Sequence, residues 1–255
     1  MNLAGIDMII LWPALVAGLL VTATHVPLGI QVLSRGIVFI DLAIAQIAGL
    51  GVICADWFGF EPHGWAVQIS ALTAALAGAL FLTWTEKHWP DVQEAVIGVV
   101  FILAASGALI VLASNPQGAE HLKELLVGQV LWVNPAHLPF VAVIYAVILL
   151  VWFARGERIG RVVFYLLFAC AVTASVQLVG LYLVFTTLIV PALATRRFAR
   201  GRVAAGYAVG AAGYALGLVV SAVSDWPSGP AIVWVMTALA VLVFASGPRA
   251  ATGER

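Results

Sequence analysis

Charged side chains are scarce in this chain. Only 9% of the 255 residues are charged, 12 basic and 12 acidic, whereas 63% are hydrophobic. A soluble domain has about a quarter of its residues charged, because its surface must face water. The sequence therefore predicts a protein that presents most of its exterior to lipid. The net charge of zero gives no indication of nucleic-acid binding.

The chain also has few groups for covalent, redox or phosphate chemistry. Its two cysteines, Cys54 and Cys170, lie in separate apolar segments without a partner at the spacing of a metal or redox motif. We find no GxxxxGKS or GxxxxGKT phosphate loop. We also find no compact Ser-His, His-Glu-x-x-His or paired-Asp cluster. A fused ATPase is therefore excluded from this chain, and a membrane hydrolase or protease is disfavoured.

Long apolar runs separated by short polar breaks divide the sequence. Backbone groups in lipid must make their hydrogen bonds internally, and the runs lack the alternation of barrel strands, so each predicts a helix. The expected fold is an all-α membrane protein, a polytopic bundle of about eight or nine transmembrane helices, with residues 1–255 as one transmembrane domain. The expected spans are 9–33, 37–57, 65–85, 94–114, 138–154, 162–179, 181–195, 203–223 and 231–246.

One region of the bundle admits two alternatives. Only Gly180 separates the runs 162–179 and 181–195, and Pro191 interrupts the second run. The runs form either two tight crossings or one long helix followed by a broken, re-entrant segment. Irregular backbone at membrane depth survives only where protein buries it or a cavity wets it, which makes this region of functional interest.

The basic residues indicate how the bundle is oriented. If the helices alternate from an external N-terminus, most Lys and Arg side chains are cytoplasmic, while the opposite loops carry Asp56, Glu61 and Asp225. Lys123 is the exception on the outer side. This agreement favours nine crossings, or an equivalent count, in a multi-pass protein of a bacterial inner membrane. The cytoplasmic set is Arg35, Lys87, Arg155, Arg158, Arg161, Arg196, Arg197, Arg200, Arg202, Arg249 and Arg255.

The longest loop is residues 115–137. Apolar residues recur there at helical spacing between Leu122 and Val130, which predicts a short amphipathic helix at the membrane interface. Glu120, His121 and Glu124 in this loop are more typical of a solvated face than of a ligand set.

Four polar side chains within the spans are candidates for a translocation pathway: Asp41, Gln46, His25 and Glu94. A charged group at the centre of a membrane helix costs about 2.5–3.5 kcal/mol on insertion scales, so each ionisable one is a functional hypothesis. Imidazole and carboxylate groups bind first-row divalent cations such as zinc and manganese. These residues alone predict a transporter or channel and do not name its cargo.

Each candidate also has a structural alternative. Asp41 could cap or pair near the cytoplasmic end of its helix, and Glu94 could stabilise a helix start through the helix dipole. His25 could satisfy a carbonyl that Pro27 leaves free. Gln46 could tie two helices together by hydrogen bonds, and it lies about 140° from Asp41 round a helix, so the two do not share a face.

Three segments carry a family resemblance. Residues 179–200 read VGLYLVFTTLIVPALATRRFAR, an apolar run with a proline, small residues and a basic end. Residues 221–233 (SAVSDWPSGPAIV) combine an acid, a proline and a Gly-Pro pair, and residues 34–51 read SRGIVFIDLAIAQIAGLG. In this order, over nearly the whole chain, they resemble the ABC-3 permease family of zinc and manganese ABC transporters, which includes the zinc-uptake permease.

The resemblance implies a dimeric membrane channel, homodimeric or heterodimeric, that imports zinc, manganese or iron. It also implies two partners, a cytoplasmic ATPase subunit and a periplasmic metal-binding protein. The partner would hydrolyse ATP, so this chain is expected to be a transporter subunit and not an enzyme. It would carry no cofactor of its own, and the divalent metal would be its substrate.

An alternative function is a secondary transporter that moves a cation or small solute with protons or sodium. Asp41 and Glu94 would be its proton carriers. Such folds commonly contain repeats in their two halves, and no clear internal repeat is visible in this sequence.

The chain departs from the family pattern in the second helix. The family has an Asp there, followed four residues later by a His, and both are thought to contact metal. Asp41 matches the acid, but Ala45 occupies the second position and Gln46 follows it. An amide is a poorer zinc ligand than imidazole. Either another group such as His25 supplies a nitrogen, the ion differs, or the cargo binds weakly.

A second departure is the loop 155–161, which reads RGERIGR. Family members have a longer segment here that docks into the ATPase. The candidate ATPase contacts in this chain are Arg155, Arg158 and Arg161, and their docking is expected to differ from that of the family.

Overall fold

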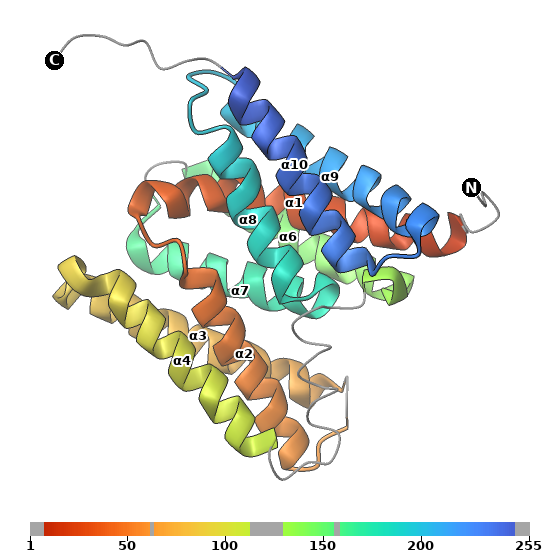
Figure 1. Cartoon of the computed structure of the whole chain (residues 1–255). Coiled ribbons are helices and arrows are strands. Elements are labelled where there is room, and N and C mark those ends of the chain that lie inside the picture. The colour runs from red at the N-terminus through yellow and green to blue at the C-terminus, as the bar shows by residue number, and fades with distance from the viewer. Residues whose placement is uncertain (1–7, 62–63, 113–129, 156–158, 248–255) are drawn as a thin grey trace, which may run out of the picture.

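The computed structural model describes residues 8–61, 64–112, 130–155 and 159–247, which fold into α-helices and short 3₁₀-helices (Figure 1). The α-helices are α1 (Met8–Arg35), α2 (Ile40–Trp57), α3 (Trp65–His88), α4 (Gln93–Leu112), α6 (Leu138–Arg155), α7 (Arg161–Val179), α8 (Leu181–Ala194), α9 (Arg202–Ser224) and α10 (Ser228–Ser246). The 3₁₀-helices are η2 (Pro90–Val92), η3 (Val130–Trp132) and η4 (Pro135–His137).

The helices coincide with the spans expected from the sequence. Within the described residues, eight helices, all those named except α8, are long and apolar enough to cross a membrane. Exposed tryptophans stand near helix ends, among them Trp57, Trp65, Trp84 and Trp89, as expected for side chains at the two membrane–water interfaces. The prediction of an all-α, polytopic membrane protein is confirmed.

The region 162–195 consists of two separate helices, α7 and α8. Gly180 joins them with a φ of 84°, a conformation that favours glycine, and it is buried. At about 1.5 Å per residue, the 14 residues of α8 extend about 21 Å, less than the roughly 30 Å of a hydrocarbon core. Because Gly180 is buried, the turn between α7 and α8 lies inside protein, and α8 is shorter than a full hydrocarbon span.

The helices form two groups that meet at α7. In Figure 1, α2, α3 and α4 lie together on one side, and α1, α8, α9 and α10 lie on the other. Both α2 and α3 pack against α7, which also contacts α1 and α8. One large hydrophobic core extends through both groups, from Ala14 on α1 to Ala240 on α10, and a small second cluster lies between α2 and α4.

In the group formed by α1, α8, α9 and α10, glycines allow helices to approach one another closely. A Cβ atom on Gly29 of α1 would overlap the carbonyl oxygen of Leu188 on α8. A Cβ atom on Gly210 of α9 would overlap the side chain of Thr22 on α1. Small residues let helix backbones approach closely in membranes, where packing drives association. The glycines therefore hold α1 tightly between α8 and α9.

A tight turn places the start of α2 beside the end of α1. The N–H of Gly36 donates to the carbonyl of Leu33, and the N–H of Ile37 donates to that of Val32. Gly36 has a φ of 70°. This pair of bonds around a left-handed glycine is a Schellman motif, which ends α1 and reverses the chain. Helix α2 begins at Ile40, four residues after Gly36.

Several helix ends carry arginines, and several of these arginines contact a neighbouring helix. We call this end of the bundle the basic end. The Arg35 guanidinium lies 4.3 Å from the ring centre of Phe164 at the start of α7. Nε of Arg161 lies 3.1 Å from Oε2 of Glu86 near the end of α3. The arginines that follow α8 lie over Phe244 near the end of α10. The opposite, acidic end carries Asp56, Glu61 and Asp225.

Candidate functional site

Asp41 is the second residue of α2 and has none of its surface exposed. The sequence placed it further inside a span, but the turn after Gly36 delays the helix start to Ile40. The N–H groups of Asp41 and Leu42 are nearby, yet neither carboxylate oxygen has a well-formed hydrogen bond within the described residues. A carboxylate at this place is favoured by the helix dipole. Both oxygens remain uncommitted to another side chain.

Glu94, the second residue of α4, reaches the same helix start. Its Oε1 accepts a hydrogen bond from the backbone N–H of Phe39 at 3.3 Å, and Phe39 is the N-cap residue of α2. The first N–H groups of a helix have no partner within the helix, so Glu94 caps α2 from a neighbouring helix. Its Oε2 is buried, with no hydrogen bond in the described part of the chain. Glu94 thus caps the helix start of which Asp41 is the second residue.

The other two predicted pathway residues lie elsewhere. Gln46 is half-buried on α2, more than one turn beyond Asp41 and on a different side of the helix. His25 is fully buried on α1, where its Nδ1 lies 3.1 Å from the carbonyl oxygen of Val21. Its Nε2 has no hydrogen-bond partner among the residues described. His25 therefore has one imidazole nitrogen engaged within α1 and one uncommitted.

The carbonyl that Pro27 frees has a partner from another helix. Proline lacks the N–H that would bond to the residue four positions earlier, which is Ala23. The hydroxyl of Tyr207 on α9 donates to the Ala23 oxygen at 3.0 Å. The structural alternative for His25, that it satisfies this carbonyl, is therefore wrong.

The three predicted ATPase contacts have different surroundings. Arg155 is the last residue of α6 and is exposed. Arg161 is the first residue of α7, and Glu86 of α3 already pairs with its guanidinium. Arg158 lies outside the described residues, as do Glu120, His121 and most of the expected amphipathic helix in the loop 115–137.

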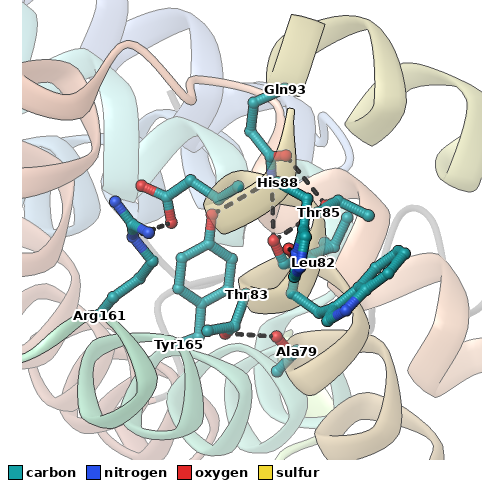
Figure 2. Close-up of polar contacts among 10 residues, drawn as sticks. Ala79, Leu82, Thr83, Thr85, His88, Gln93, Arg161 and Tyr165 are labelled. Atoms are coloured by element: carbon teal, nitrogen blue, oxygen red, sulfur yellow. Dashed lines mark hydrogen bonds and ion pairs between the residues drawn. The ribbon is translucent and has the colours of Figure 1, made fainter. Parts of the chain in front are cut away.

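A buried polar cluster at the basic end was not predicted from the sequence (Figure 2). The carboxamide of Gln93 donates to the carbonyl of Leu82 at 3.0 Å and to the Tyr165 hydroxyl at 3.4 Å. Its Oε1 accepts from the Thr85 hydroxyl at 2.9 Å. Gln93 is only 4% exposed. The signal in the sequence was a glutamine and a glutamate side by side at the start of an apolar run, shortly after Pro90.

These side chains do not form a complete metal site within one chain. Among the described residues, no group of three or more His, Cys, Asp and Glu side chains could hold a metal ion. A first-row divalent cation needs about four ligands. The uncommitted carboxylate of Asp41 could supply some of them, with the remainder from elsewhere.

Comparisons with known proteins agree with this architecture. A model of the ABC 3 transport family matches residues 7–159 and 156–247. The chain is 26% identical to the "High-affinity zinc uptake system membrane protein ZnuB" of Haemophilus influenzae, over 91% of this chain and 96% of that protein. It is 24% identical to a "Probable iron transport system membrane protein" of the same organism, over 71% and 72% of the two chains.

A solved structure has the same fold. PsaBC from Streptococcus pneumoniae, determined in complex with a Fab, superposes with a TM-score of 0.78 over 97% of both chains, at 20% sequence identity. The two family matches together cover nearly the whole sequence, including the start of α2 and the turn between α7 and α8. The chain therefore belongs to the ABC 3 transport family, as a membrane-spanning permease subunit.

Proposed function

We propose that this permease imports a divalent metal ion, zinc, manganese or iron, and that Asp41 stands in the translocation pathway. The proposal draws its cargo from the relatives, whose names refer to zinc uptake and iron transport. The observation that carries the role of Asp41 is its carboxylate, fully buried at a helix start without a well-formed hydrogen bond in the described chain.

Burying a carboxylate without well-formed hydrogen bonds costs free energy that no side chain in the described chain offsets. A charged group taken from water needs a partner or a bound cation to offset its lost hydration. A carboxylate suits zinc, manganese and iron(II), all of which accept oxygen ligands. Because the carboxylate is closed off from solvent, an ion reaches it only when the side chains around the start of α2 move apart.

The incomplete ligand set favours a dimeric transporter. One chain offers Asp41, Glu94, Gln46 and His25 at three separate places, so Asp41 alone cannot satisfy a cation. A second permease subunit would bring a second acid of the same kind to the pathway. This arrangement needs no ligand beyond those that two copies and water provide.

The partners would bind at opposite ends. The basic end is expected to be cytoplasmic by the positive-inside rule, and there the ATPase would dock near Arg155 and Arg158. Arg161 is held by Glu86, so its charge contributes less to that surface. The periplasmic metal-binding protein would then deliver its ion at the acidic end, and ATP binding to the ATPase would drive the ion across.

The test is uptake of radioactive zinc, manganese and iron by cells that express this chain with an ATPase and a binding protein encoded beside it. The control is the same cells without this chain. We expect accumulation of at least one metal that depends on both the chain and ATP. Accumulation driven by a proton or sodium gradient without the ATPase would instead support a secondary transporter, and no accumulation of any of the three metals would refute the proposed cargo.

A further inference from the structure

The first turn of α4 contacts the rest of the molecule in two directions through two consecutive residues. Gln93 points into the buried polar cluster shared with α3 and α7 (Figure 2). Glu94, the next residue, caps α2 through the N–H of Phe39. The placement of the α2 start therefore depends on the same helical turn that Gln93 holds.

Gln93 is a buried, uncharged side chain that makes three hydrogen bonds to two neighbouring helices. It donates to two acceptors, Leu82 on α3 and Tyr165 on α7, and it accepts from Thr85 on α3. Tyr165 has none of its surface exposed. If the buried amide lost its partners, its polar atoms would be desolvated without hydrogen bonds, which costs free energy. The network therefore holds the first turn of α4 in one place.

A second contact keeps α3 and α7 in register beside the cluster. Glu86, one residue after Thr85, pairs with Arg161 four residues before Tyr165. The side chain of Glu86 is only 15% exposed. The ion pair and the Gln93 carboxamide thus connect the same two helices one turn apart, so the turn that carries Glu94 rests on a rigid support.

We propose that Gln93 is a positioning residue, whose carboxamide fixes the first turn of α4 against α3 and α7 and thereby sets where Glu94 caps α2 and where Asp41 stands. The functional part rests on the proposed role of Asp41 in transport, whereas the structural part does not. Gln93 itself touches no ion. Its effect on transport passes through the position of the α2 start.

The experiment compares two substitutions of buried polar residues in the same region. Gln93→Met keeps the length of the side chain but removes all three contacts. Thr83→Val is the matched control, because the Thr83 hydroxyl, 8% exposed at the residue level, donates only to Ala79 in its own helix in the described structure. Gln93→Glu tests partial rescue, since a carboxylate still accepts from Thr85 and can accept from the Tyr165 hydroxyl, but no longer donates to the Leu82 carbonyl.

The first measurement is the distance between the starts of α2 and α7. Spin labels are attached through Phe39→Cys and Val162→Cys, both exposed positions, after Cys54 and Cys170 are replaced by alanine. The Phe39→Cys change keeps the backbone N–H that Glu94 binds. We expect Gln93→Met to shift or broaden the distance distribution, Thr83→Val to leave it unchanged, and Gln93→Glu to restore it in part.

The second measurement is metal transport by each variant in proteoliposomes with the ATPase, supplied with metal-loaded binding protein. We expect Gln93→Met to lower the maximal rate per folded transporter by roughly threefold to thirtyfold. The KM for the loaded binding protein should not change, because that protein docks at the other end. A loss of folded protein alone would not alter the rate per folded transporter.

Two results would overturn the inference. An unchanged distance distribution in Gln93→Met would show that the carboxamide does not set the α2 start, whatever happens to transport. A shifted distribution with a normal maximal rate would show that the position of the α2 start is irrelevant to transport. If Asp41→Asn transported normally, the proposed role of Asp41 in the pathway would fail, but the distance measurement would still decide whether Gln93 positions α2.

Discussion

Oε1 of Glu94 accepts a hydrogen bond from the backbone N–H of Phe39, 3.3 Å away, although the two residues are 55 positions apart in the sequence. The bond joins the start of α4 to the start of α2. Because α2 carries Asp41 as its second residue, a capping contact and a candidate ion ligand share one helix start. The stability of this start and its role in transport can therefore be tested separately.

Removal of the cap should destabilise the protein. We expect Glu94→Ala to lower the free energy of unfolding by about 1 kcal/mol, the usual cost of losing an N-cap acceptor. Glu94→Gln keeps an oxygen acceptor and should cost less. Thermal unfolding of the purified protein in detergent measures both. Equal losses for the two variants would show that the hydrogen bond to Phe39 contributes nothing to stability.

The contact between α1 and α8 leaves no room for a side chain at Gly29. We expect Gly29→Ala to destabilise the protein by about 1–3 kcal/mol, because the new methyl group would overlap the carbonyl oxygen of Leu188. Gly98→Ala on α4 is the matched control, since a Cβ atom there has nothing within 4 Å. Thermal unfolding of the two variants measures the difference, and we expect the lower midpoint for Gly29→Ala. Similar midpoints would contradict the close packing of α1 against α8.

The orientation of the bundle can be read from chemical labelling. In a chain whose two native cysteines are replaced by alanine, we expect Trp226→Cys at the acidic end to react with a membrane-impermeant maleimide added outside spheroplasts. Arg200→Cys at the basic end should react only after the membrane is opened. The reverse pattern would invert the topology and move the proposed ATPase surface to the wrong side.

Most of the fold could be predicted from the sequence because membrane helices need long apolar runs. The nine expected spans each correspond to one helix, and the break at Gly180 was visible as a glycine between two runs. Asp41, Glu94 and His25 were found because ionisable residues are rare in such segments. The expected run 181–195 was already the shortest of the nine, and α8 ends one residue earlier, at Ala194.

The contacts among these residues could not be predicted from the sequence. The bond from Phe39 to Glu94 and the cluster around Gln93 join segments that are far apart in the chain, and no periodicity encodes such pairs. One alternative from the sequence paired the carbonyl freed by Pro27 with His25, on the same helix, whereas the structure pairs it with Tyr207 on α9. Local reasoning favours local partners, and tertiary packing overrode it here.

The most direct test of the account is metal uptake by Asp41→Asn in cells that contain the ATPase and the binding protein. Asparagine has nearly the same shape but no charge, so the helix start should remain intact. We predict that uptake per transporter falls about tenfold or more while the amount of protein in the membrane stays close to that of the wild type. Wild-type uptake would contradict a role for Asp41 in the pathway, and parallel loss of uptake and protein would show that Asp41 serves the structure.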